Sequence, residues 1–258
     1  MVISEKIGDV AAEVLEKFLL EEIKKGEKPR HLGIITDGNR RYAAQKGMDP
    51  NDGHVKGKDK LEEVLQWCMD IGIKIVTVYG FSTENFKRNK KEVDFLFKLI
   101  NRSLENLMVD ERVRRNGMRV KVIGEFGRLP RYLVETIKKT EKFTSQFSNF
   151  RLNLAIGYGG REEIINGIKK VVRDVMNGKI TIDDITEEKF RNYLYDSSLP
   201  DPDLILRTSG EERVSNFLLW QGAYSELYFT EVNWPSLRKI DFLRAIYSYQ
   251  QRQRRFGK

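Results

Sequence analysis

Three short segments of the chain combine carboxylates, arginines and small polar residues in a way that suits phosphate binding. They cover residues 36–41, with the triplet Asp37-Gly38-Asn39, residues 80–85 and residues 207–210. A carboxylate beside glycine leaves backbone N–H groups where an anion can approach closely, because glycine has no side chain in the way. Such triplets also form ordinary turns, so the triplet alone does not decide between a turn and a site.

Arginines flank the same segments and strengthen the phosphate interpretation. A guanidinium group donates two parallel hydrogen bonds to phosphate oxygens, so several arginines at one edge of a sheet could hold two diphosphate groups. Mg²⁺ takes carboxylate, phosphate and water oxygens, so one or two acidic residues suffice when a diphosphate supplies the other ligands. The arginines are Arg40, Arg41, Arg88, Arg207 and Arg213.

The chain lacks the motifs of several common enzyme classes. It has no Walker glycine loop, no G-x-G-x-x-G after a strand, no H-E-x-x-H and no G-x-S-x-G. Its single cysteine, Cys68, excludes disulfide and zinc frameworks, and apolar neighbours at helical spacing predict a buried thiol. Nucleotide-binding, zinc-peptidase and serine-hydrolase functions therefore lose support.

Alternating helical and strand-like patterns would position these segments. Apolar residues at helical spacing predict helices, and short apolar or β-branched runs predict strands. Their alternation predicts a single α/β domain, with a mostly parallel central sheet surrounded by helices. Predicted strands cover residues 31–36, 73–79, 118–123, 150–156 and 204–207, and predicted helices cover residues 55–69, 93–108, 133–143 and 162–176.

Each of the three polar segments follows a predicted strand. Open parallel sheets bind ligands in the crevice beyond the carboxyl ends of their strands. We therefore expect residues 36–41, 80–85 and 207–210 to meet at one site.

The N-terminal residues predict an amphipathic helix that ends near Gly26. Its outer face is acidic and would be repelled by anionic lipid, so we expect it to pack on the protein's own body. No apolar stretch is long enough to span a membrane and no signal pattern is present, which predicts a cytoplasmic protein that could work at the membrane surface. The apolar positions of the helix are Ile7, Val10, Ala11, Val14, Leu15, Phe18 and Leu19.

The formal net charge of +8 and the isoelectric point near 9.4 indicate an anionic partner. Nucleic acid, a membrane surface and a phosphorylated small molecule all satisfy that condition. Basic and acidic residues are interleaved along the whole chain, so charge alone does not choose among them.

The polar segments and their surroundings resemble the signatures of the cis-prenyltransferases, a family that includes undecaprenyl and dehydrodolichyl diphosphate synthases. Arg40 stands where bacterial members often have glycine, and this form occurs in archaeal and eukaryotic members; we expect an archaeal-type member. The similarity spans residues 30–257, so residues 1–29 are interpreted as a helical extension of one domain covering residues 1–258. The matching stretches are His31–Ala43, Tyr79–Phe86, Ile156–Arg161, Leu206–Glu211, Arg213–Trp220, Ala223–Phe229 and Trp234-Pro235.

The resemblance implies roles for individual residues. Asp37 would be a magnesium ligand and catalytic carboxylate, Glu226 its partner ligand, and Asn85 would help to remove a proton. An amide is a poor base, so a diphosphate oxygen could remove that proton instead. The implied substrate-binding residues are Gly38, Asn39, Arg40, Arg41, Tyr42, His54, Ser82, Thr83, Glu84, Phe86, Arg88, Arg207, Arg213, Val214 and Ser215.

The resemblance also implies an activity. A member of this family would condense isopentenyl diphosphate in cis onto farnesyl or geranylgeranyl diphosphate, and would make a medium or long Z-polyprenyl diphosphate that serves as a glycosyl-carrier lipid precursor. It would use Mg²⁺, form a homodimer, bind no nucleic acid and deliver its lipid product to a membrane. The helix at residues 93–108 would line an apolar tunnel, and Arg255-Phe256-Gly257 would bind isopentenyl diphosphate in the neighbouring subunit.

Three alternatives stay open at this point. The chain could be a non-catalytic partner subunit of a heteromeric prenyltransferase, although such subunits lack the Asp-Gly-Asn site. It could use an unusual prenyl acceptor, because Pro50 stands where relatives often carry a basic residue. Its net charge also suits an RNA-binding protein, which would need a continuous basic patch with exposed aromatic residues.

Overall fold

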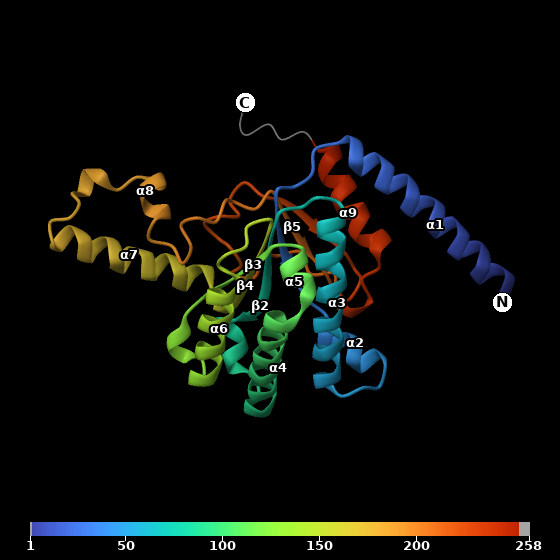
Figure 1. Ribbon diagram of the computed structural model, residues 1–258, viewed down its shortest axis with the longest axis horizontal. Helices are drawn as coiled ribbons and strands as arrows, with labels where there is room; N and C mark the ends of the chain where they lie inside the picture. The colour runs from blue at the N-terminus through green and yellow to red at the C-terminus, as the bar shows by residue number, and fades with distance from the viewer. Residues whose placement is uncertain (1, 253–258) are drawn as a thin grey trace. The chain divides into compact units, whose positions relative to one another are not determined.

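The computed structural model describes residues 2–252, with side chains described from residue 12 onward. Within these residues six strands form one sheet in the order β3-β4-β2-β1-β5-β6 (Figure 1). The β1–β5, β3–β4 and β5–β6 pairs are parallel, which confirms the predicted α/β class with a mostly parallel sheet. The strands are β1 (His31–Ile35), β2 (Ile75–Ser82), β3 (Met118–Ile123), β4 (Phe150–Tyr158), β5 (Leu204–Arg207) and β6 (Glu226–Phe229).

Helices account for most of the remaining regular structure. In the described part of the chain, none of them offers a stretch long and apolar enough to cross a bilayer. The α-helices are α1 (Val2–Lys25), α2 (Asn39–Gln45), α3 (Pro50–Asp70), α4 (Lys90–Val109), α5 (Glu111–Arg115), α6 (Arg131–Thr144), α7 (Gly160–Met176), α8 (Glu187–Arg191) and α9 (Lys239–Gln251). Short 3₁₀ turns are η1 (Thr83–Lys87), η2 (Phe126–Arg128), η3 (Ile182–Asp184) and η4 (Trp234–Ser236).

The main predicted elements agree with the structure, and two important ones were not predicted. The bounds of β3 and β5 are as predicted, while β2 and β4 continue past their predicted ends to Ser82 and Tyr158. The sequence pattern predicted neither β6, which has four half-buried residues, nor α9. In α9 buried residues lie on several sides of the helix, so it lacks the single apolar stripe that marks a surface helix.

The chain divides into two compact units. In the described residues, unit 1 comprises residues 2–76, 202–212 and 224–252, and unit 2 comprises residues 77–201 and 213–223. Unit 1 therefore contains β1, β5 and β6, and unit 2 contains β3, β4 and most of β2. The prediction of a single domain stays a prediction, and Arg255-Phe256-Gly257 lies outside the described residues.

In unit 1, α1 packs along α9 (Figure 1). Leu19 and Ile23 of α1 are buried, and the Gln250 amide of α9 donates a hydrogen bond to the Ile23 carbonyl oxygen at 3.1 Å. The helix thus packs on the protein's own body, as predicted from its acidic outer face. Val14 and Phe18, which the pattern placed on its apolar face, are exposed instead.

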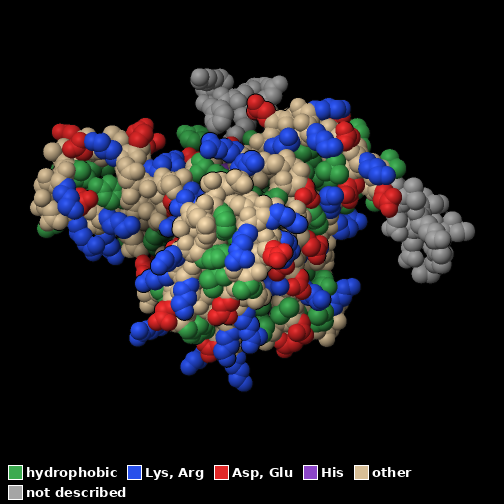
Figure 2. Space-filling view, viewed as in Figure 1, with side chains coloured by type: hydrophobic (Ala, Val, Ile, Leu, Met, Phe, Trp, Pro, Cys, Tyr) green, Lys and Arg blue, Asp and Glu red, His purple; other side chains and the backbone are tan. Residues whose placement is uncertain are grey.

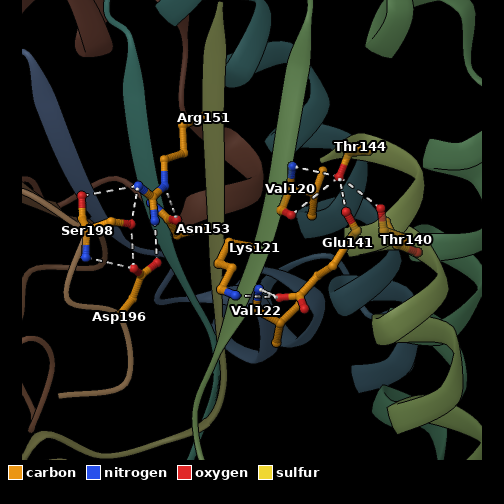
Figure 3. A network of polar contacts seen from close by, with 10 residues as sticks. All are labelled: Val120, Lys121, Val122, Thr140, Glu141, Thr144, Arg151, Asn153, Asp196 and Ser198. Atoms are coloured by element: carbon orange, nitrogen blue, oxygen red, sulfur yellow. Dashed lines mark hydrogen bonds and ion pairs between the residues drawn. The ribbon is translucent and has the colours of Figure 1, made fainter. Parts of the chain in front are cut away.

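In unit 2, side chains of α6 cover the outer edge of β3 (Figure 3). The Val120 N–H donates to the Thr144 hydroxyl at 3.1 Å, and the Val122 N–H donates to the Glu141 carboxylate at 2.8 Å. The Thr144 hydroxyl in turn donates to the Thr140 carbonyl oxygen at 2.8 Å. Because an unpaired strand edge can pair with another chain, these contacts both satisfy buried groups and close the edge.

A second polar network ties β4 to the segment after α8 (Figure 3). The Arg151 guanidinium pairs with Asp196 and donates to the Asn153 side chain at 2.9 Å and to the Ser198 hydroxyl at 3.1 Å. The Asn153 amide continues the network to the Thr77 hydroxyl at 3.1 Å. Within unit 2 this network therefore fixes β2, β4 and the residues that follow α8.

The helix predicted to line an apolar tunnel is α4. Its buried residues include Phe97 and Leu104, and the helix packs against α6, where the Thr140 hydroxyl lies 3.3 Å from the Leu104 carbonyl oxygen. Phe97 also contacts Phe81 of β2, with ring centroids 4.9 Å apart. This face belongs to the core of unit 2, and the tunnel stays a prediction.

Thr144→Val tests the closure of the β3 edge. Valine keeps the shape of the side chain but removes the acceptor of the buried Val120 N–H, so we expect the free energy of unfolding to fall by about 1–3 kcal/mol. Urea titration followed by circular dichroism measures this change. The matched control is Thr136→Val on the same helix, because Thr136 is buried but its hydroxyl holds no strand N–H in the described residues. Equal losses in the two variants would contradict the account.

Candidate functional site

The turn after β1 holds Asp37 beside Arg207 in unit 1. The Asp37 carboxylate accepts a hydrogen bond from the Gly38 N–H at 2.8 Å and one from the Arg207 guanidinium at 2.9 Å. The parallel register places Ile35, near the end of β1, opposite Arg207, the last residue of β5. The Arg207 side chain is 4% exposed and that of Asp37 is 33% exposed. The sheet thus places a carboxylate that reaches solvent beside a buried cation.

The backbone of the same turn is held by two further hydrogen bonds. The Asp37 carbonyl oxygen accepts from the Thr208 hydroxyl at 2.7 Å and from the Trp234 N–H at 2.9 Å. The indole N–H of Trp234, whose side chain is fully buried, donates to the Gly57 carbonyl oxygen at 2.8 Å. Asp37 is therefore connected to the segment after β5, to η4 and to α3.

Gly38 allows this turn to pass close to Asn233. Its φ of 101° lies in the region that favours glycine, and a Cβ atom there would lie 3.0 Å from the Asn233 Cα atom. Asn233 is itself fixed, because its side chain accepts from the Ser209 hydroxyl at 3.1 Å and donates to Gln45 at 3.0 Å. Glycine is required at this position because its φ is positive and because a Cβ atom would overlap Asn233.

Asn39, the first residue of α2, packs against α3. Its side-chain amide donates to the Thr36 carbonyl oxygen at 3.3 Å, and its side-chain oxygen is buried without a hydrogen bond in the described residues. A Cβ atom at Gly53 or Gly57 of α3 would overlap Asn39 atoms. The side chain predicted to bind substrate therefore also fits between two helices.

Arg41 links α2 to the segment after β5. Its guanidinium donates to the Ser209 carbonyl oxygen at 2.6 Å, contacts the Ser209 hydroxyl and pairs with Glu211. Residues 36–41 and 207–210 therefore meet in unit 1, as predicted. The other predicted site residues of this part are Arg40, which is exposed, Tyr42, which is half-buried, and His54, which is buried.

The structure does not bring Glu226 to Asp37. Glu226 begins β6 opposite Leu204, the first residue of β5, whereas Asp37 lies at the level of Arg207, the last residue of β5. Three residues of strand separate these levels, which corresponds to about 10 Å. Glu226 instead pairs with Arg252 at 2.7 Å. The geometry therefore supports Asp37 as a metal ligand but does not support Glu226 as a second ligand of the same ion.

In unit 2, β2 ends in a reciprocal capping arrangement at η1. The Asn85 N–H donates to the Ser82 hydroxyl at 3.3 Å, and the Ser82 N–H donates to the Asn85 side-chain oxygen at 2.9 Å. The oxygen of the predicted catalytic amide is therefore already used to hold the turn. Thr83 is buried beside it.

Phe86 and Arg88 also have partners within unit 2. The Phe86 ring packs edge-on against Phe81, with centroids 4.9 Å apart, and the Arg128 guanidinium lies 3.8 Å from the Phe86 centroid. Arg88 pairs with Glu92 at 3.0 Å. These contacts order the residues that follow β2.

The segment at residues 213–218 lies against η1. The Tyr79 hydroxyl lies 3.3 Å from the Ser215 carbonyl oxygen, and the Asn216 amide donates to the Glu84 carboxylate at 3.0 Å. Burial opposes ionisation of Glu84, but hydrogen bonds from its own N–H, Ser82 and Asn216 hold the pKa of its carboxyl below the ordinary value. Unit 2 thus brings residues 82–88 and 213–218 together. Of the remaining predicted residues, Arg213 is exposed, and Val214 and Ser215 are half-buried.

Asp37 suits a metal ion that obtains most of its ligands from outside the chain. In the described residues no group of three or more His, Cys, Asp or Glu side chains could hold a metal ion. Mg²⁺ commonly binds through one or two carboxylates together with water and phosphate oxygens. The donor set therefore fits Mg²⁺ bound jointly with a diphosphate and does not fit a cage built from protein ligands alone.

Sequence reasoning gave no role to the residues that hold the Asp37 turn. Thr208 fell within a polar segment and Trp234 within a family motif, but their hydrogen bonds to Asp37 join segments far apart in the chain and leave no local pattern. The contact of Asn233 with the Asp37 turn is also long-range and likewise leaves no local pattern in the sequence. Residues 80–85 belong to unit 2, so their place beside residues 36–41 and 207–210 stays a prediction.

The sequence of the chain matches a known protein family and is similar to two archaeal relatives over nearly its whole length. The prenyltransferase family model described as undecaprenyl diphosphate synthase matches residues 35–257. A tritrans,polycis-undecaprenyl-diphosphate synthase (geranylgeranyl-diphosphate specific) of Thermoplasma volcanium is 66% identical over 258 residues and is covered completely, as is this chain. The relative of the same description from Picrophilus torridus is 68% identical, with 97% of this chain and 98% of the relative covered.

A solved structure agrees with the fold. The crystal structure of lavandulyl diphosphate synthase from Lavandula x intermedia, in complex with dimethylallyl diphosphate, superposes with a TM-score of 0.86 at 35% identity. The match covers 90% of this chain and 99% of that chain. The α/β sheet with its surrounding helices is therefore the fold of a known diphosphate-using enzyme.

Gly38→Ala tests the close approach of the Asp37 turn to Asn233. Left-handed backbone costs a residue with a Cβ atom roughly 1–2 kcal/mol, and the overlap with Asn233 adds to that cost, so we expect a larger loss in the free energy of unfolding. Gly47→Ala is the matched control, because Gly47 has a φ of 65° but nothing within 4 Å of a Cβ atom. Chemical denaturation of both variants measures the difference. A loss at Gly38 no larger than at Gly47 would contradict the steric argument.

Proposed function

Because the chain belongs to the undecaprenyl diphosphate synthase family of prenyltransferases, we propose that it condenses isopentenyl diphosphate in cis onto geranylgeranyl diphosphate and releases a long Z-polyprenyl diphosphate. The prenyltransferase class is common to the family model and the relatives. The Asp37 turn is the observation that carries the proposal, because it holds a carboxylate and a buried arginine side by side at the carboxyl end of parallel strands.

The primer and the product length rest on the relatives' names. The sequence alone left farnesyl and geranylgeranyl diphosphate as possible primers, and the relatives' names favour geranylgeranyl diphosphate. An undecaprenyl product has eleven isoprene units and the primer four, so the enzyme would carry out seven condensations. Such a lipid suits a glycosyl carrier, and we propose that use for it.

Asp37, Arg40 and Arg41 are assigned to the departure of the allylic diphosphate. Asp37 would bind the Mg²⁺, which supplies positive charge to the leaving diphosphate as the allylic C–O bond breaks. Arg40 and Arg41 would donate hydrogen bonds to the diphosphate oxygens, and these bonds strengthen as negative charge builds up there. Gly38 and the start of α2 keep the backbone close to the same anion.

The condensation itself needs no covalent intermediate with the protein. The isopentenyl double bond attacks the allylic carbon as the diphosphate leaves, and loss of a proton from the adjacent carbon forms the Z double bond. Arg207, Arg213 and Ser215 would hold the isopentenyl diphosphate, so that orientation selects the face of the reaction. A diphosphate oxygen takes the proton, because the Asn85 amide is a poor base and its oxygen already accepts the Ser82 N–H.

The rival interpretations have less support. A non-catalytic partner subunit would lack the Asp-Gly-Asn site, which is present here, and the full-length relatives are named as synthases. Pro50 begins α3 behind the Asp49 cap, so its presence has a structural reason in addition to any effect on the acceptor. An RNA-binding protein would need a continuous basic patch, whereas Lys and Arg are mixed with Asp and Glu on the face in Figure 2.

A homodimer is proposed from an apolar stripe on α7. Ile165, Ile168, Val172 and Met176 lie on one side of this helix and are 45–80% exposed. Hydrophobic side chains are visible at the surface of the α7 and α8 segment in Figure 2. A stripe of this kind commonly marks a protein contact, and a second copy of the chain is the occupant that the family resemblance implies. We propose a cytoplasmic enzyme that passes its product to a membrane.

Asp37→Asn tests the proposed reaction. Purified protein is incubated with Mg²⁺, labelled isopentenyl diphosphate and geranylgeranyl diphosphate, and the extracted products are dephosphorylated and sized by chromatography. We expect Z-linked products from the wild type that disappear with EDTA, and a loss of roughly 100-fold or more in kcat/KM for the variant. Asp70→Asn on α3 is the control carboxylate and should leave activity intact. Full activity of Asp37→Asn would contradict the assigned metal site.

Ile168→Lys tests the proposed dimer. A charge in the middle of the stripe would have to be desolvated in a dimer, so we expect a shift toward monomer in light scattering coupled to size-exclusion chromatography. Val109→Lys on α4 introduces the same charge at another exposed apolar residue and should leave the mass unchanged. A wild-type monomer, or a dimer that survives Ile168→Lys, would exclude this interface.

A further inference from the structure

The segment that carries Arg213 and Ser215 has an unusual backbone. Ser215, Asn216 and Leu218 have φ values of 45°, 66° and 43°, and none of them is glycine. Such conformations persist only where the surrounding structure holds them, and they cluster at functional sites. The contacts that hold this segment are therefore informative about its role.

Asn216 caps the N-terminus of α7. Its backbone carbonyl oxygen accepts the Gly160 N–H at 2.8 Å, and its side-chain oxygen accepts the Arg161 N–H at 2.8 Å. The residue before the helix, Gly159, has no side chain to cap it. Asn216 thus satisfies two N–H groups that a helix start leaves without intrahelical partners.

The amide nitrogen of Asn216 binds two carboxylates, one on η1 and one in the first turn of α7. It donates to the Glu84 carboxylate at 3.0 Å and to the Glu162 carboxylate at 3.3 Å. A Cβ atom at Gly159 would lie 2.8 Å from the Asn216 amide nitrogen and 2.6 Å from the Thr83 hydroxyl oxygen. This close packing shows that η1, α7 and the 213–218 segment meet at Asn216.

Neighbouring contacts hold the segment on both sides of Asn216. Phe217 stacks on Tyr79 with ring centroids 4.8 Å apart. Further along, the Gln221 amide donates at 3.1 Å to the Glu163 carboxylate, which is buried and also accepts the Tyr158 hydroxyl at 2.5 Å. The segment is therefore fixed to β2, β4 and α7 within unit 2.

We propose that Asn216 is a positioning residue that holds Arg213 and Ser215 in the conformation that binds isopentenyl diphosphate. The proposal rests on the proposed function, and Asn216 itself touches no substrate in it. The chemistry explains the choice of residue. Asparagine tolerates left-handed backbone, offers an acceptor to the helix N-terminus and keeps a donor for two carboxylates. Glycine adopts left-handed backbone but has neither the side-chain acceptor nor the donor. Aspartate keeps the acceptor, lacks the donor and adds a third negative charge beside the two carboxylates. Alanine has no side-chain acceptor or donor and disfavours left-handed backbone.

Steady-state kinetics of Asn216→Gly, Asn216→Asp and Asn216→Ala test the proposal. A lost cap changes an equilibrium by roughly threefold to thirtyfold, so we expect the KM for isopentenyl diphosphate to rise by about that factor in the alanine variant. The KM for geranylgeranyl diphosphate should stay near the wild-type value. The glycine variant keeps the backbone conformation and should be less impaired than alanine, which also keeps the test valid if alanine does not fold.

Thr186→Ala is the matched control. It removes the side-chain cap of α8, where the Thr186 hydroxyl accepts the Lys189 N–H at 3.2 Å, in the same unit but in another segment. We expect it to lower the thermal midpoint without changing the KM for isopentenyl diphosphate. A general loss of stability would therefore not imitate the predicted effect.

The outcomes separate this proposal from the proposed function. A wild-type enzyme that incorporates no isopentenyl diphosphate overturns the function. An active wild type whose Asn216 variants keep the same KM for isopentenyl diphosphate, or raise both KM values equally, overturns the positioning role and leaves the function standing. A selective rise that glycine partly restores supports the role.

Discussion

The two hydrogen bonds to the Asp37 carbonyl oxygen are the constraint on which the rest of the proposed site depends. The Thr208 hydroxyl and the Trp234 N–H fix the backbone of the turn, and the Gly38 N–H and Arg207 then orient the carboxylate. Hydrogen bonds thus hold both the backbone and the carboxylate of Asp37. The side chain therefore loses little further conformational entropy when a cation binds, which lowers the entropic cost of binding.

This arrangement follows from the parallel pairing of β1 and β5. The register that sets Ile35 opposite Arg207 brings the ends of two strands together, although about 170 residues separate them in the sequence. The segment at Asn233 and Trp234 then closes over the turn, and this approach is the reason that residue 38 must be glycine. The orientation of the Asp37 carboxylate therefore depends on contacts from all three segments.

In unit 2, side-chain contacts rather than glycine hold a predicted substrate-binding segment in left-handed backbone. The residues around Asn216 adopt left-handed backbone without glycine, and the strain is balanced by side-chain contacts to η1 and the start of α7. Side-chain contacts that hold the backbone in this way limit the directions in which Arg213 and Ser215 can point, which suits the binding of a diphosphate. The same dependence makes the segment sensitive to substitutions that leave the core intact.

The sequence predicted the elements whose pattern is local and missed those that depend on long-range contacts. The apolar periodicity of α3, α4, α6 and α7 and the β-branched run of β2 were sufficient to place these elements, and the buried environment of Cys68 followed from the same pattern. Four residues with half-buried side chains gave no signal for β6, and burial on several sides hid α9.

The candidate site shows the same division. The Asp-Gly-Asn triplet and the arginines were visible in the sequence because glycine and arginine have distinct chemistry. The roles of Thr208, Trp234 and Asn216 depend on partners in other segments, and the level of Glu226 along the sheet depends on strand register, so none of these could be read from spacing alone.

The most direct test of the central claim is a titration calorimetry experiment with the unreactive thiolodiphosphate analogue of geranylgeranyl diphosphate, with and without Mg²⁺. We expect Mg²⁺ to tighten binding to the wild type by about tenfold or more, and binding to Asp37→Asn far less, because the Asp37 carboxylate supplies the protein ligand. The same tightening in the wild type and in Asp37→Asn would show that the metal ion does not bind at Asp37, and would contradict the account.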